Sequence, residues 1–342
     1  MKRIWKQFLL SLSIVIVFLV IWQWKWVSYG WMQLSGGANV ILKARSVTEM
    51  MADSSVPDSL KAKLRFVEEI RRFAVDSLGL TDTPNYQSYY DQHGQPICYI
   101  LTVAEKYQMK SVDFSFPLIG SFEYKGFFDL QRAKEEQKQW TNYDTDIDPV
   151  AAYSTLGYFH DPILSSMLEL PAGKLASLLI HEMTHSTLFI KNNHEFNENL
   201  ANFIGDYGAV RFLAQRFGTQ SKEYRTYTEG KVFREKYIRH FNRGTHLLDS
   251  LYQSFAPQLS STQKAQRKIQ LIQQIISSTD SLYHDLPAVR KRRWTTLPNN
   301  AFFVGFSTYN SQRNEFENTF KKKFNSDFKR YLTFLKAQHP SL

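Results

Sequence analysis

Leu178-Leu179-Ile180-His181-Glu182-Met183-Thr184-His185 is the stretch that decides what this 342-residue chain is expected to be. It holds an H-E-x-x-H motif within an apolar run, and Pro171 marks the start of the predicted helix. Side chains at i and i+4 share one helix face, so His181 and His185 can reach the same metal ion. Glu182 then lies beside the open coordination position, where a carboxylate can take a proton from water. The motif therefore predicts a zinc hydrolase with Zn²⁺ as its cofactor.

A catalytic zinc site needs a third protein ligand. Leu188 and Lys191 stand where metzincins carry Gly and a third His, which excludes that arrangement. After a predicted turn the next helix begins with Asn-Glu, and this returning helix would bring Glu198 toward the histidines. Two His and one Glu is the ligand set of gluzincins. His194 and Glu195, at the turn, remain rival third ligands.

Two further polar residues follow on the same predicted helix. Asn202 and Asp206 lie one and two turns after Glu198, where they could hydrogen-bond a ligand. A fourth ligand, from His194 or Asp206, would instead close the site and make the zinc structural. The alternative to an enzyme is therefore a non-enzymatic envelope protein with a structural zinc site.

Composition limits the remaining classes. The chain has 43% hydrophobic residues and a net charge of +10, and its single cysteine, Cys98, excludes an internal disulfide. Basic clusters occur at 290–293 and 321–323, but no nucleic-acid-binding motif accompanies them, so no nucleic-acid partner is expected. A membrane-surface binding module built on these clusters is a third alternative.

The N-terminal segment is apolar. Residues 7–24 carry no charge, and Lys2, Arg3 and Lys6 precede them. Eighteen residues at about 1.5 Å each cross most of a bilayer core, which predicts a transmembrane anchor over 7–27. The positive-inside rule places residues 1–6 in the cytoplasm and residues 28–342 outside, in the periplasm of a single-pass inner-membrane protein. A cleaved signal peptide is the competing interpretation.

The pattern along the chain predicts an α+β fold, mainly helical with a small antiparallel sheet. Helical spacing covers 38–80, and β-branched and aromatic runs within 96–128 predict strands, with one more at 150–158. Zinc-site helices are expected over about 172–215 and a helical C-terminal part over about 216–342.

Beyond the zinc helix, the chain resembles a family of bacterial predicted aminopeptidases, which are envelope-associated proteins with an H-E-x-x-H zinc motif. The resemblance runs in order over about 29–215, with an echo near 299–301 and 308–309. The shared segments are Tyr29-Gly30, 33–43, 70–74, 78–80, 86–89, Phe116-Pro117, Gly120, 124–128, 152–157, 181–185 and Phe196-Asn197-Glu198.

The resemblance implies a zincin-like, zinc-dependent peptidase that acts on peptide substrates. It implies His181, His185 and Glu198 as zinc ligands and Glu182 as general base. Many members carry a cysteine for lipid attachment after the apolar segment, whereas this chain has no cysteine before Cys98.

Catalysis needs two further groups. A donor must stabilise the oxyanion, for which Tyr309 is the candidate and Tyr153 the alternative. An aminopeptidase must also bind the free amine of its substrate, and Glu123, Asp161 and Glu169 are equal candidates. The expected function is therefore a zinc aminopeptidase, with an endopeptidase left open and the oligomeric state not indicated.

Overall fold

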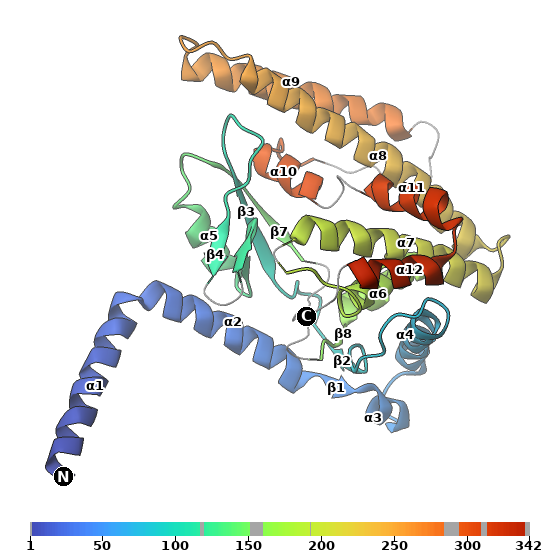
Figure 1. Cartoon of the computed structure of the whole chain (residues 1–342), viewed down its shortest axis with the longest axis horizontal. Coiled ribbons are helices and arrows are strands. Elements are labelled where there is room, and N and C mark those ends of the chain that lie inside the picture. Colours follow the sequence, from blue (N-terminus) through green and yellow to red (C-terminus); the bar gives the residue numbers. More distant parts are fainter. Residues whose placement is uncertain are drawn as a thin grey trace.

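The computed structural model of the protein describes residues 2–116, 120–150, 160–191, 193–283, 294–308 and 313–338. Helices dominate it, and small sheets complete an α+β fold (Figure 1). The helices are α1 Lys2–Trp22, α2 Trp24–Lys43, α3 Val47–Ala52, α4 Asp58–Asp76, α5 Leu130–Gln137, η1 Ser165–Glu169, α6 Ala172–His185, α7 His194–Phe217, α8 Lys222–Gln253, α9 Ser261–Ser278, η2 Thr279–Tyr283, α10 Asn300–Thr308, α11 Arg313–Phe324 and α12 Phe328–Gln338. The strands are β1 Arg45–Ser46, β2 Ser88–Tyr90, β3 Tyr99–Ala104, β4 Phe114–Phe116, β5 Gly120–Phe122, β6 Tyr124–Phe127, β7 Asp144–Pro149 and β8 Ile163–Leu164.

The strands form three small sheets among the described residues. The one nearest to the expected sheet is antiparallel, with β3 between β6 and β7. The hairpin β4–β5 is a second, and the third joins β1, β2 and β8 with β2 and β8 parallel. The single antiparallel sheet expected from the sequence is thus replaced by three.

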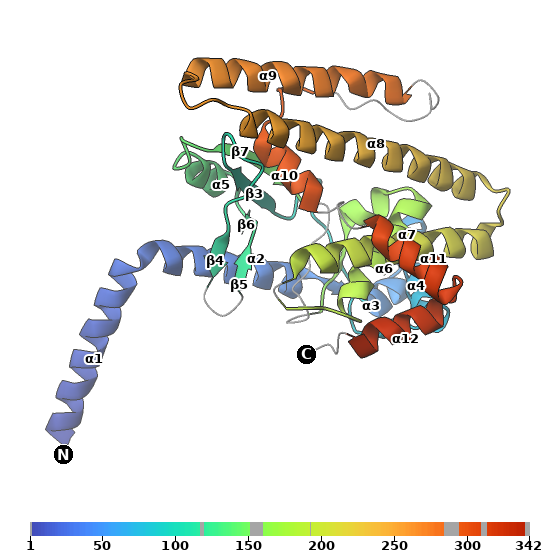
Figure 2. The same cartoon turned by 45° about the horizontal axis from the view of Figure 1, so that its top comes forward.

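Side chains alternate between the two faces of the central sheet. Leu101 and Val103 of β3 are fully buried on one face, in an apolar cluster with Phe127. The other face carries Ile100 and Thr102, and α10 packs against it (Figures 1 and 2).

Two apolar cores lie beyond the sheet. The larger is enclosed by α4, α6, α7, α11 and α12, with Ile70, Leu179 and Ile204 fully buried. The smaller joins α8, α9 and α10 around Phe241 and Phe303. In Figure 2, α8 and α9 run side by side above the rest of the molecule.

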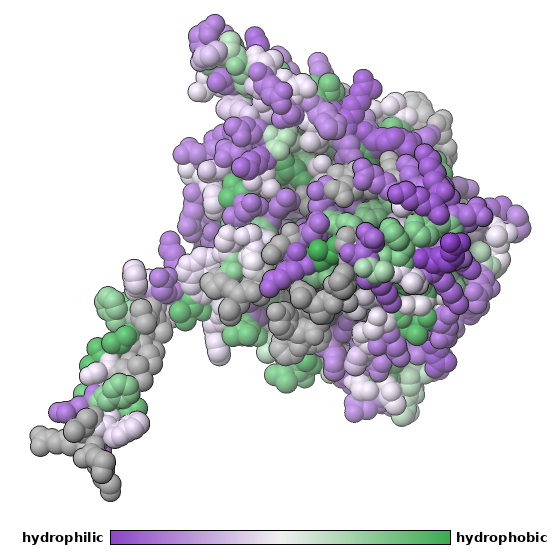
Figure 3. Space-filling model, in the orientation of Figure 1, coloured by the Kyte–Doolittle hydropathy of each residue, from purple (hydrophilic) through white to green (hydrophobic). Residues whose placement is uncertain are grey.

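The N-terminal segment differs from its prediction. Within the part of the chain that the structure describes, no helix has the length and apolar character needed to cross a membrane. This finding contradicts the predicted anchor over 7–27, and with it the single-pass inner-membrane location and the membrane as a partner. Apolar side chains such as Phe18 and Ile21 are nevertheless exposed on α1, which projects from the body (Figures 1 and 3).

The segment predicted as one span, 7–27, is not one helix. The helical run is interrupted at Gln23, whose backbone has φ −99° and ψ 23°, and a second helix starts at Trp24. This helix, α2, belongs to the body: Tyr29 Oη and Gln33 Nε2 donate hydrogen bonds of 3.0 and 2.7 Å to the carbonyl of Gly126 in β6. An apolar run in the sequence does not show that part of it packs on a distant strand.

Other predictions from the sequence agree better with the structure. The helical segment predicted over 38–80 comprises the end of α2, α3 and α4, with β1 and a loop between them. α6 follows Pro171 directly, as predicted. The strand predicted at 150–158 lies, apart from Val150, outside the described residues.

Candidate metal centre

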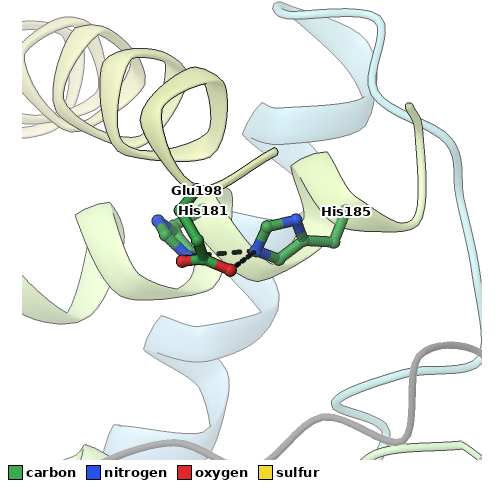
Figure 4. A group of neighbouring side chains, drawn as sticks. All are labelled: His181, His185 and Glu198. Carbon is green, nitrogen blue, oxygen red and sulfur yellow. Dashed lines mark hydrogen bonds and ion pairs between the residues drawn. The ribbon is translucent and has the colours of Figure 1, made fainter. Parts of the chain in front are cut away.

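Three side chains from two helices converge on one point (Figure 4). His181 and His185 extend from the last two turns of α6, and Glu198 comes from the second turn of α7. The two Nε2 atoms are 3.2 Å apart, and each lies 3.4 Å from one oxygen of Glu198. These three donors form a group that could hold a metal ion.

Glycines allow α6 and α7 to approach closely enough for this convergence. A Cβ on Gly205 would lie 2.6 Å from the carbonyl oxygen of Ser177 and 3.2 Å from Cβ of His181. A Cβ on Gly208 would lie 2.8 Å from Ile180. Because real Cβ atoms do not approach backbone atoms this closely, position 205 requires glycine for the helices to cross where they do, whereas at position 208 the neighbouring side-chain ends would have to shift.

The turn between the helices is held by Asn197, which precedes Glu198. Asn197 is 1% exposed, and its side chain hydrogen-bonds both backbone groups of Ile190, accepting from N–H at 2.9 Å and donating to C=O at 2.8 Å. Asn193 caps α7 by accepting from N–H of Phe196. The amide of Asn197 thereby fixes where the returning helix starts, and with it the position of Glu198.

Burial, hydrogen bonds and neighbouring charges together set the pKa values of these three side chains. Burial lowers the pKa of His181, but the hydrogen bond that its ring donates to Glu198 and the charges of Glu182 and Glu198 outweigh it, so the pKa is raised. Burial also disfavours the charge of Glu198, yet its histidine partners hold its pKa below the usual range. Burial and the charge of His181 lower the pKa of His185 to about 3, which leaves that imidazole neutral and able to bind a metal.

Asn202 supports His181 from α7. Its side chain is hydrogen-bonded to the His181 ring. Such outer partners fix the orientation of a metal-binding imidazole, which is the position suggested for Asn202 from the sequence.

Glu182 is half-buried beside the group. Burial raises its pKa to about 7; the charge of His181 opposes this shift, and those of Glu198 and Asp161 add to it. A carboxylate that titrates near neutral pH can both take up and release a proton there.

The structure distinguishes the rival ligands. Among the described residues, the metal-binding group contains Glu198 and neither His194 nor Glu195. His194 lies next to the group, with Nδ1 3.8 Å from Glu198. Asp206 accepts hydrogen bonds from Tyr227 and, at 2.8 Å, from Arg234, so its carboxylate is engaged away from the histidines. Among the described residues the candidate group thus has three donors, which is the number of protein ligands in catalytic zinc sites.

The structure does not describe the two tyrosines that the sequence suggested as donors to the oxyanion. Tyr309 and Tyr153 both lie outside the described residues. The structure instead brings Tyr124 of β6 to the site: its ring centroid is 5.7 Å from that of His194. Burial raises the Tyr124 pKa, and the charges of Glu198 and Glu182 add to this. The strand that holds Tyr124 was predicted from the sequence. Its proximity to His194, 70 residues later in the chain, leaves no local signal in the sequence.

The three candidate amine-binding carboxylates lie in different surroundings. Glu169 is exposed and pairs with Lys63 at 3.0 Å, and Asp161 is 1% exposed. Glu123 precedes Tyr124 and lines a cavity together with it.

Comparison with known proteins gives one match. A family model described as "Putative aminopeptidase" matches residues 28–339. This confirms the family resemblance and extends it well beyond 29–215. No curated protein and no solved structure matches the chain.

Proposed function

Since the chain belongs to the Putative aminopeptidase family, we propose that it is a zinc-dependent aminopeptidase whose centre is formed by His181, His185 and Glu198. The observation that carries this proposal is the spacing of the three donor atoms, 3.2–3.4 Å. With bonds of about 2.0–2.1 Å, the donors of a tetrahedral zinc site lie about 3.3 Å apart. The side chains therefore already have the separation that zinc requires.

The donor types support zinc as well. Two imidazole nitrogens and one carboxylate oxygen form a common ligand set of catalytic zinc. The low pKa values of His185 and Glu198 keep both in the form that binds a cation near neutral pH. The ion would supply a Lewis acid and lower the pKa of its bound water to about 7.

Glu182 has the properties of the general base. It follows His181 directly in the chain, and its pKa of about 7 suits a group that accepts a proton from water and passes it to the leaving amine. Asn202 holds the ring of His181 in orientation. In this proposal Tyr124, which lies beside His194, is the donor to the oxyanion, in the part that Tyr309 was expected to play.

The test is digestion of a peptide library by the purified full chain with zinc, read by mass spectrometry. We expect stepwise loss of single N-terminal residues, and a rate at least 100-fold lower for Glu182→Gln with bound zinc unchanged. Glu195→Gln is the matched control, because it makes the same change at an exposed carboxylate one turn before Glu198, and it should keep the activity.

Two results would contradict the proposal. Internal cuts that require Glu182 would replace the aminopeptidase by an endopeptidase at the same centre. If zinc-loaded wild-type protein cleaved no peptide, the result would favour a structural metal site instead of an enzyme.

A further inference from the structure

A cavity of about 220 Å³ lies between the central sheet and α10. Its sheet side includes Ile100 and Thr102, and its helix side includes Phe302, Gly305 and Phe306. These groups are mostly apolar. An apolar protein cavity of about 150 Å³ is large enough for benzene, so this one has room for a side chain as large as that of Leu or Phe.

The cavity lies beside the metal centre. Tyr124 lines it, and the same ring contacts His194, whose Nδ1 is 3.8 Å from Glu198. Tyr124 therefore belongs both to the wall of the cavity and to the surroundings of the candidate metal centre.

The cavity also has an acidic side. Glu123 and Asp148 line it, and both are more accessible than Ala301 and Phe302 on its helix side. Glu123 precedes Tyr124 in the chain, whereas Asp148 comes from β7 on the far side of β3. An apolar interior with carboxylates at its accessible side suits a ligand that joins an apolar group to an ammonium group.

We propose that this cavity receives the N-terminal residue of the peptide substrate, with the apolar side chain against α10 and the ammonium group beside Glu123. The inference rests on the proposed function and adds its substrate class: unblocked peptides that begin with a large apolar residue. Of the three candidate carboxylates, Glu123 is the one that lines this cavity.

Gly305 sets the size of the cavity. A Cβ at this position would meet the nearest atoms, those of Thr102, at 3.8 and 3.9 Å, which is ordinary contact. Gly305→Ala therefore adds a methyl group to the cavity without a clash, and alanine is also the better helix former. Because one methylene in a fitted apolar pocket is worth about 10- to 200-fold in discrimination, this substitution should change ligand choice and leave the fold intact.

The primary test measures binding and does not depend on turnover. Zinc-loaded Glu182→Gln protein is titrated calorimetrically with leucinamide, alaninamide and N-acetyl-leucinamide. We expect leucinamide to bind at least tenfold more tightly than either of the others. Adding Gly305→Ala should weaken leucinamide at least tenfold and alaninamide less than threefold, and adding Glu123→Gln should weaken both amides.

Gly230→Ala is the control for the glycine substitution, since a Cβ there meets nothing within 4 Å. It should leave all three affinities unchanged. Equal affinities for leucinamide and its acetylated form, or a leucinamide affinity that Gly305→Ala does not alter, would overturn the inference, as would no binding at all. Expected binding without peptide cleavage by wild-type protein would overturn only the proposed function.

Discussion

At the scale of the residue, the ionised carboxylate of Glu182 lowers the stability of the folded chain, which a neutral side chain at this position would not do. Its pKa is raised from 4.5 to about 7 in the folded chain, so the folded state binds more protons than the unfolded state between these values. The contribution of Glu182 to stability is therefore greatest below about pH 4.5 and falls as the pH rises to about 7. In metal-free protein, Glu182→Gln should raise the free energy of unfolding by about 2–3 kcal/mol at pH 8, with little effect at pH 4.5.

Denaturant unfolding of both metal-free proteins at the two pH values measures this difference. Glu195→Gln provides the comparison, because its side chain is exposed. A gain for Glu182→Gln that is the same at both pH values would show that packing, rather than ionisation, distinguishes the two side chains.

At the scale of the element, the crossing of α6 and α7 depends on Gly205. In Gly205→Ala the new methyl group would meet the backbone oxygen of Ser177 at 2.6 Å, and the helices must separate to admit it. We expect a loss of about 1–3 kcal/mol in the free energy of unfolding, against a helix-propensity gain of about 1 kcal/mol. Because His181 faces the same contact, zinc affinity measured by chelator competition should fall as well.

Gly230→Ala in α8 makes the same chemical change in open space. It should stabilise the protein by up to about 1 kcal/mol and leave zinc affinity unchanged. If Gly205→Ala behaved in the same way, the close crossing would not be what positions Glu198.

At the scale of the whole molecule, Asp144 joins the central sheet to α9 and α10. It forms an ion pair with Lys268 and accepts a 2.8 Å hydrogen bond from N–H of Asn300. Lys268 is 8% exposed, and burial lowers its pKa. Asp144→Asn should destabilise the protein by about 3–5 kcal/mol, because a buried ammonium group loses its counter-charge.

Thermal and denaturant unfolding check this, with Glu169→Gln as the control because the Lys63–Glu169 pair is exposed and worth less than about 1 kcal/mol. The double variant Asp144→Asn with Lys268→Met should recover much of the loss, since it removes the stranded charge. A loss that the double variant does not recover would point to the Asn300 contact instead.

The sequence was sufficient where chemistry follows local geometry. Two histidines four residues apart share a face of any helix, so the candidate metal-binding pair could be predicted from residues 181–185 alone. The start of α6 after Pro171 and the helical return to Glu198 are equally local, since each depends on a few neighbouring residues. The family, too, was indicated by motifs in order along the chain, and the family model confirms it.

Only the tertiary structure decided what depends on contacts between distant residues. The separation of Glu198 from the histidines depends on glycines that let two helices cross, and the pKa of Glu182 depends on what buries it. The same holds for α2, which packs on β6, and for the cavity, whose walls come from β3, β6, β7 and α10. Local patterns specify which face a side chain occupies, whereas packing between segments far apart in the chain decides what that face meets.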